Sequence, residues 1–257
     1  MPFHYPVTFS QGNHFASVDL NSPPWHRRCE ICGSYEQFSK CYQEIIKAAP
    51  SNANIWRDYA VDQKEIWQKY EDALASVDRA LQIDPRFSEV WEIKGVILNN
   101  LGRYQDAIFC CERAIELDRF DDSAWTEKGY AFGQMKSYDE SLRCFETALA
   151  INPQKFSAWE SKGYILCLLG KFEKSYQAYD VAISINPMNA QSWNNKGYCL
   201  DKLGRYDEAL FAYDEAIRID PDYISAWNNK GATLQRLSRF AEADAAFAKA
   251  KKLGYVG

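Results

Sequence analysis

The chain has 257 residues, of which 47% are apolar and 25% charged, so it can bury a sizeable core and wholesale disorder is excluded. Its formal charge of −5 argues against nonspecific nucleic-acid binding, because backbone phosphates reward clustered lysine and arginine. No apolar run reaches membrane-span length and the first residues lack a signal-peptide pattern, so we expect a cytoplasmic protein with reduced cysteines and no membrane contact.

Residues 1–21 are predicted to be extended. Large apolar residues alternate there with proline and polar residues, beginning at Phe3 and Tyr5, and proline keeps such a segment out of a central sheet strand. We expect either a loose tail or one laid over the following helices. The alternative is that the segment is itself a ligand for the groove of its own chain or of a neighbour.

Residues 22–53 are predicted to form a degenerate repeat that caps the rest of the chain. A Pro-Pro pair after Ser22 suits the start of a first helix, and Ser34 suits the N-cap of a second. Apolar residues then follow one helical face: Tyr35, Phe38, Tyr42, Ile45 and Ala49. Pro50 lies 35 residues before Pro85, which places this segment one step upstream of a regular array.

Four potential metal ligands lie in this segment. They are His26, Cys29, Cys32 and Cys41. Two interpretations give them a function, either a zinc site or a thiol redox pair. We favour core packing, because Cys29 and Cys32 fall where other repeats carry leucine, and Cys41 has counterparts at Cys110 and Cys144. We therefore expect no metal and no cofactor.

From residue 54 onward the sequence repeats every 34 residues. One column is tryptophan: Trp91, Trp125, Trp159, Trp193 and Trp227. A glycine column follows four residues later: Gly95, Gly129, Gly163, Gly197 and Gly231. Large aromatic residues and alanine form two further columns, and proline marks the ends of most units. Chance does not align so many columns, so the repeat is real.

Each unit is predicted to be a pair of antiparallel helices. Apolar residues from Trp193 to Leu203 follow one helical face, and Gly204 ends that helix because glycine accepts the left-handed conformation. A second helix carries its apolar face from Tyr206 to Ala216 and ends before a proline. Such a pair leaves half of its apolar surface uncovered until the next pair stacks on it, which predicts an all-α solenoid.

These residues resemble the tetratricopeptide repeat. Within one unit the family pattern is met by Trp193, Gly197, Leu200, Ala209, Tyr213 and Pro221. Six units are assigned on this basis: 54–87, 88–121, 122–155, 156–189, 190–223 and 224–257. The first is irregular, because Trp56 is one residue out of register. The resemblance implies a right-handed superhelix of stacked antiparallel helix pairs that binds partners on its inner surface and performs no chemistry.

Two places depart from the regular array. Arg119 replaces the proline of the other inter-repeat turns, and we expect a softer joint there. No further unit covers the last helix, so we expect an apolar edge within residues 241–257 at Ala245, Phe247 and Ala248. Self-association through this edge or through the N-terminal segment, giving a homo-oligomer, is one alternative function.

In the family, the first helix of each unit lines the concave side, so its variable positions are groove candidates by resemblance. The middle units offer an aromatic row: Tyr130, Tyr164 and Tyr198. The last two units offer paired amides: Asn194, Asn195, Asn228 and Asn229. Lys202 and Arg236 lie nearby, whereas earlier units offer glutamates such as Glu89 and Glu160. Amides suit the backbone of an extended peptide and tyrosines its side chains, with the acidic part of the peptide toward the two basic residues.

Two recognition devices of the family can be compared with these positions. The clamp that some members use for chaperone C-termini is absent, because Glu92 and Glu160 stand at the matching places. Of the asparagine ladder that another branch uses, only Asn195 and Asn229 remain. A chaperone C-terminus is therefore a disfavoured partner.

A lysine column stands where the family pattern has leucine: Lys94, Lys128, Lys162, Lys196 and Lys230. An anion-binding stripe is one interpretation of it. We expect instead that each lysine lays its stem over apolar surface, with its ammonium group near carboxylates such as Asp106 or Glu208.

The leading interpretation is a non-enzymatic scaffold that holds an extended segment of a partner protein. The alternatives are the self-assembling protein described above and a zinc- or thiol-dependent regulator that uses the N-terminal cysteines. An enzyme is disfavoured, because no histidine, nucleophile elbow or glycine-rich phosphate loop lies in the array.

Overall fold

The computed structural model describes residues 34–255, and between these limits it contains helices and turns but no strand. The predictions for residues 1–21, for the first helix of 22–53 and for His26, Cys29 and Cys32 lie outside this range. The chain divides into two units, Met1–Phe120 (unit 1) and Asp121–Gly257 (unit 2). The division falls in the turn where Arg119 replaces proline, and the softer joint expected there stays a prediction.

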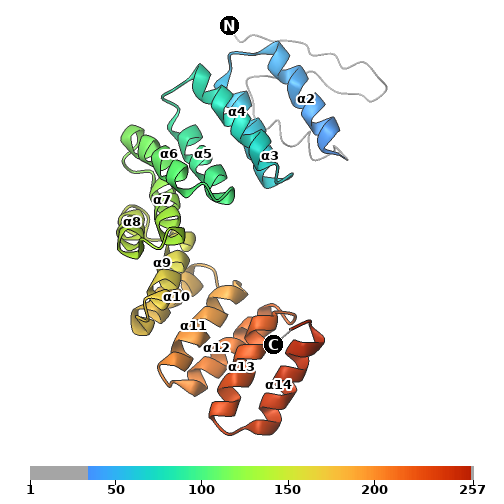
Figure 1. Ribbon diagram of the computed structural model, residues 1–257, viewed down its shortest axis with the longest axis vertical. Coiled ribbons are helices and arrows are strands. Elements are labelled where there is room, and N and C mark those ends of the chain that lie inside the picture. Colours follow the sequence, from blue (N-terminus) through green and yellow to red (C-terminus); the bar gives the residue numbers. More distant parts are fainter. Residues whose placement is uncertain (1–33, 256–257) are drawn as a thin grey trace. The chain divides into compact units, whose positions relative to one another are not determined.

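Unit 1 begins, in its described part, with a helix that stands before the first regular pair. Its helices are α2 (Tyr35–Ala48), α3 (Ala53–Glu65), α4 (Tyr70–Ile83), α5 (Ser88–Asn100) and α6 (Tyr104–Leu117), and each packs on the next in chain order (Figure 1). Ser34 is the N-cap of α2, as predicted, because its hydroxyl accepts the Gln37 amide at 3.3 Å. Helix α2 covers α3 with Phe38, Tyr42 and Ile45.

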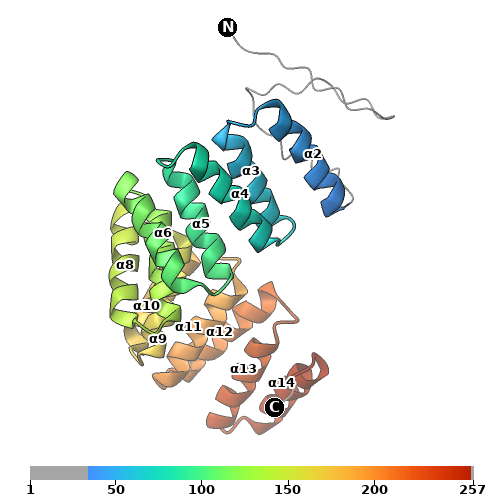
Figure 2. The same cartoon turned by 45° about the horizontal axis from the view of Figure 1, so that its top comes forward.

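Unit 2 contains four helix pairs. They are α7 (Asp122–Gln134) with α8 (Tyr138–Ile151), α9 (Phe156–Leu168) with α10 (Phe172–Ile185), α11 (Ala190–Lys202) with α12 (Tyr206–Ile219), and α13 (Ile224–Arg236) with α14 (Phe240–Lys252). Figures 1 and 2 both show α11, α12, α13 and α14 following one another side by side. The first helices α7, α9, α11 and α13 also contact each other in succession, so they form one face of the unit. The predicted all-α solenoid of stacked helix pairs is confirmed.

The helix-ending turns share one backbone conformation. Gly204 has a φ of +77°, as its predicted role at the helix end requires, and the amide of Arg205 returns to the Leu200 carbonyl at 2.9 Å. The equivalent residue has positive φ in every described pair: Gln68, Gly102, Lys136, Gly170, Gly204 and Ser238. Three of these are not glycine, so the turn geometry is imposed by the packed helices as well as by residue type.

The glycine column allows the two helices of a pair to touch. A Cβ atom at Gly197 would lie 2.7 Å from the ring of Tyr213, which is too close for two carbon atoms. The same clash would arise at Gly231, where the ring of Phe247 lies 2.7 Å from the position of a Cβ. Large aromatic residues of the second helix therefore fill the space that glycine leaves on the first.

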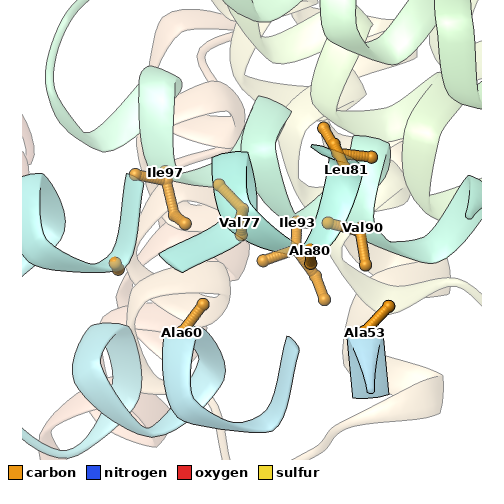
Figure 3. Close-up of a cluster of buried hydrophobic side chains, with 9 residues drawn as sticks. Ala53, Ala60, Val77, Ala80, Leu81, Val90, Ile93 and Ile97 are labelled. Carbon is orange, nitrogen blue, oxygen red and sulfur yellow. The ribbon is translucent and has the colours of Figure 1, made fainter. Parts of the chain in front are cut away.

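The core between successive pairs is made of aliphatic side chains. Figure 3 shows one such cluster, in which Ala60 of α3, Val77 and Ala80 of α4, and Ile93 and Ile97 of α5 point toward one another. All five are at most 4% exposed. Because α5 belongs to the next pair, this burial stabilises the stacking of pairs as well as each pair itself.

Tryptophan and lysine of the first helix join each pair to the one before it. The indole of Trp193 donates to the Pro187 carbonyl at 3.0 Å, and Trp91, Trp159 and Trp227 make the same bond six residues back. Lys196 lies 5.2 Å above the Trp193 ring and pairs with Asp180 on the preceding helix α10. The same ion pair recurs as Lys94–Asp78, Lys162–Glu146 and Lys230–Asp214.

The lysine Nζ atoms lie beside the tryptophan rings. The hydrogen bonds from Arg205 lower the pKa of Glu208, one of the carboxylates expected nearby, and Lys196 adds to this effect. The direct ion-pair partners of the lysines, however, are other carboxylates. Asp106 is held by Arg103 at 2.8 Å and Glu208 by Arg205 at 2.7 Å, each within one helix turn. The lysines instead reach a carboxylate 16 residues earlier, on the helix that precedes their own. These ion pairs therefore link neighbouring repeats.

The last helix also differs from expectation. Phe247 of α14 is half-buried against Gly231 of α13 and does not belong to an exposed apolar edge. Ala245 and Ala248 are exposed, as expected. Ala248 occupies the column in which the earlier pairs carry Asp180 and Asp214, so α14 lacks the carboxylate that binds the lysine of a following repeat.

Candidate functional site

The face formed by the first helices of unit 2 contains a depression of about 490 Å³. Three of these helices each supply two lining residues four positions apart, a spacing that places both on one side of a helix. The pairs are Tyr130 and Gln134 on α7, Glu160 and Tyr164 on α9, and Gln191 and Asn195 on α11. Ile165, Leu168 and Tyr179 add apolar surface to the same wall. The depression combines aromatic, amide and carboxylate groups, as protein-binding surfaces do.

The aromatic row is exposed, as a groove position requires. Tyr130, Tyr164 and Tyr198 are 40%, 50% and 38% exposed, respectively. Tyr130 and Tyr164 line the depression, whereas Tyr198 lies beyond it and is covered by Lys202, whose Nζ is 5.1 Å from the ring centre. The structure therefore brings two of the three predicted tyrosines to one site.

The predicted asparagines play different parts. Asn194 is only 5% exposed, and its side chain donates to Asn195 at 3.2 Å and accepts from Asn229 at 3.0 Å. Asn195 lines the depression and also bonds the Tyr179 hydroxyl, a contact that lowers the pKa of Tyr179 against the larger rise that burial causes. Asn228 is half-buried on α13. The side chains of Asn195, Asn194 and Asn229 thus form a hydrogen-bonded chain from α11 to α13, and Asn195 is its member in the depression.

The two predicted basic residues are already engaged within the chain. Arg236 Nη1 contacts both carboxylate oxygens of Asp201, at 2.6 and 2.7 Å. Thr233 donates to the same carboxylate at 2.6 Å, and Asp201 is buried, so its charge needs such partners. Lys202 is exposed and lies over Tyr198. Arg236 is therefore a link between α11 and α13 with its charge largely compensated.

Glu160 carries the most distinctive electrostatics of the depression. It is half-buried on α9, and one carboxylate oxygen accepts the Ser192 hydroxyl at 3.0 Å. Loss of solvent raises the pKa of Glu160, and the hydrogen bond from Ser192 opposes that rise. Among residues 34–255 no lysine or arginine lies within ion-pair distance of it.

Sequence reasoning placed Glu160 among the acidic residues of the early units and missed Gln134 and Gln191. The signal that finds them is the four-residue spacing from the tyrosine and asparagine columns, since Tyr130 and Gln134 share one side of α7. The burial of Asn194 could not be predicted in this way, because Asn194 and Asn195 are neighbours of the same residue type.

Cysteines offer no metal centre within the described part of the chain. No group of three or more metal-binding side chains occurs between residues 34 and 255. Cys110 and Cys144 are buried, and desolvation raises the pKa of Cys110 to about 11, which makes it an unreactive thiol. In the same range no helix has the length and apolar character that crossing a bilayer requires.

Comparisons with known proteins identify the repeat. The sequence pattern of the tetratricopeptide repeat matches residues 88–121, 123–155 and 190–223, and a second pattern of the same repeat matches residues 212–245. No curated protein matches the chain in sequence.

Solved structures are similar in fold. MamA from Desulfovibrio magneticus RS-1 is 17% identical, with 65% of this chain and 94% of that chain covered and a TM-score of 0.61. MamA AMB-1 is 25% identical over 66% of this chain and 99% of that chain, with a TM-score of 0.57. YrrB, a TPR protein with an unusual peptide-binding site, is 20% identical over 72% and 95% of the two chains, with a TM-score of 0.55. The helix pairing, the repeat length and these structural similarities all indicate the same fold.

Proposed function

We propose that this chain, which belongs to the tetratricopeptide repeat family, is a scaffold that holds an extended segment of a partner protein along the first helices of unit 2. The observation that carries the proposal is the depression across α7, α9 and α11, with two half-exposed tyrosines beside three side-chain amides. Tyrosine gives large contact area at low entropic cost, and amides bond to peptide groups in either direction. The role is reversible binding without chemistry.

Two further observations support this surface over others. Three first helices of successive pairs contribute to it, and Tyr130 and Tyr164 occupy the same position of two successive repeats, so a partner that runs across the helices meets two equivalent tyrosines. A structurally similar chain, YrrB, is itself described as having a peptide-binding site. The second-helix side offers single exposed aromatics such as Phe109 and Phe211, each set edge-on against a tryptophan of its own pair.

Self-association through the last helix has less support. Phe247, the largest residue of the expected edge, is occupied with Gly231. Ala248 removes the carboxylate that joins each inner pair to the next, so α14 offers a second copy no ion pair of that type. A zinc- or thiol-dependent role depends on Cys29 and Cys32, which lie outside the described residues.

An array of immobilised random peptides, incubated with the full chain, tests the proposed function. We expect a subset of extended peptides to bind, and the double variant Tyr164→Ala, Asn195→Ala to lose at least about tenfold in affinity for them. The control is Phe211→Ala, which removes an exposed aromatic residue of α12 outside the depression. Equal affinity of the double variant and the parent chain would refute the groove assignment, and thermal melting shows whether the variants are folded.

A further inference from the structure

We propose that the depression receives an arginine side chain of the bound segment, with the Glu160 carboxylate as its counter-charge. This inference rests on the proposed function and specifies its chemistry. It adds a basic anchor to the partner, where sequence reasoning assigned charge recognition only to Lys202 and Arg236.

The first argument is the state of Glu160. A half-buried carboxylate loses hydration, and in folded proteins this cost is normally met by a cation or by several hydrogen bonds. Asp201 of the neighbouring helix follows the rule with Arg236 and Thr233. Glu160 accepts one hydrogen bond, from Ser192, and meets no cation among residues 34–255. The carboxylate is therefore ready to accept donors from outside the chain.

The pKa values of other glutamates also show that Glu160 lacks a cationic partner among residues 34–255. Glu208 and Glu242 each accept two bonds from one arginine, and these bonds lower their pKa values. The pKa of Glu160 is raised, because desolvation outweighs its single hydrogen bond. A guanidinium placed beside Glu160 would reverse that shift and stabilise the charged form.

The second argument comes from the tyrosine column. Lys202 lies four residues after Tyr198 and covers its ring at 5.1 Å, so one member of the column already contacts a cation. The residue four positions after Tyr164 is Leu168, which carries no charge. Tyr164 lines the depression and is 50% exposed. A partner cation can thus take the place at Tyr164 that Lys202 takes at Tyr198.

The surrounding amides favour arginine over lysine. A guanidinium has five N–H donors in a plane, and Gln134 and Gln191, whose side chains carry acceptor oxygens, line the same depression as Glu160. An ammonium group has three donors and no planar face to lay against a tyrosine. Lys136, which is exposed and also lines the depression, opposes a cation, so removing its charge is expected to strengthen binding.

The test uses nitrogen-15-labelled full chain and two small probes, N-acetyl-arginine methylamide and its neutral isostere N-acetyl-citrulline methylamide. We expect the arginine probe to shift the side-chain amide signals of Gln134, Gln191 and Asn195, with an affinity about tenfold above that of the citrulline probe. Glu160→Gln, which keeps the shape and the bond to Ser192, is expected to remove this preference. Lys136→Gln is expected to increase it.

The matched control is Asp244→Asn on α14, which removes the same unit of charge from an exposed site distant along the fold. It is expected to leave the preference unchanged. Equal binding of the two probes, no binding of the arginine probe, or an unchanged preference in Glu160→Gln would overturn the inference. If array peptides with and without arginine bound the depression equally well, the arginine inference would be overturned and the proposed function would stand. If no array peptide lost affinity in the Tyr164→Ala, Asn195→Ala variant, the proposed function itself would be refuted.

Discussion

The regular repeats and the N-terminal helices α2 and α3 are held together by different means. In four of the repeats the tryptophan donates to a proline carbonyl and lies beneath a lysine that pairs with the preceding helix: Trp91, Trp159, Trp193 and Trp227. Around α2 and α3, an aromatic cluster takes that place: Tyr35, Phe38, Tyr42, Tyr59 and Trp67. The indole groups of Trp56 and Trp67 have no acceptor among residues 34–255.

This difference shows what a repeat needs in order to be followed by another. A regular pair presents a carboxylate on its second helix and receives the previous one with the lysine of its first helix. Helix α3 has Tyr59 in the lysine column, three residues after Trp56, and α14 has Ala248 in the carboxylate column. The ladder of ion pairs is therefore confined to the inner pairs, and the aromatic packing of α2 on α3 covers the first pair without it.

The largest effect is expected in the aromatic cluster. Tyr42 is fully buried, stacks on Tyr59 at 4.6 Å and donates to Asp62 at 2.8 Å. Tyr42→Ala is expected to lower the free energy of unfolding of unit 1 by about 4 kcal/mol, because it leaves a cavity and removes a hydrogen bond from a buried carboxylate. Denaturant unfolding of the full chain measures this change. A loss below about 1 kcal/mol would show that α2 does not stabilise α3.

A smaller loss is expected at a repeat tryptophan. Trp159 is only partly buried, but it donates to Pro153 at 2.9 Å and supports Lys162 at 5.5 Å. Trp159→Ala is expected to cost about 3 kcal/mol, at the low end for large aromatic residues. Trp159→Phe serves as the control, because it keeps the ring beneath Lys162 and loses only the hydrogen bond. If both variants unfolded at the same denaturant concentration, the hydrogen bond and not the ring would be the main contribution.

The smallest effect is expected from one rung of the ion-pair ladder. A double-mutant cycle of Lys196→Met and Asp180→Asn isolates the pair, and we expect a coupling free energy of about 0.5–1 kcal/mol because both side chains retain solvent contact. The coupling is expected to fall as salt is added. The exposed pair of Arg205 and Glu208, which lies within one helix, provides the comparison. A coupling of zero for Lys196 and Asp180 would remove the ladder from the account of repeat stacking.

Much of the fold could be predicted from the columns, because one period constrains every helix at once. Gly204 as a helix end and Ser34 as an N-cap are local signals and were correct. The direct ion-pair partners of the lysines were not predicted, because these carboxylates lie 16 residues earlier in the sequence and only the stacking of the helices brings them together. The positive φ of Lys136 and Ser238 was missed, since neither residue favours that conformation by itself.

The site was predictable in outline and not in detail. The tyrosine row could be assigned to one face because its members share a position within the repeat, and Asn195 because it lies three residues before Tyr198 on the same helix. The engagement of Arg236 by Asp201 could not, because it spans two helices of different pairs. That Glu160 has a hydrogen bond from Ser192 but no cation beside it among residues 34–255 could not be predicted, because no local pattern reveals which side chains surround it.

The most direct test of the account is a nitrogen-15 chemical-shift titration of the full chain with a peptide selected on the array. The account predicts that the largest shifts fall on the first helices α7, α9 and α11, around Tyr130, Tyr164 and Asn195. Shifts concentrated on the second helices, or on α14, would contradict it.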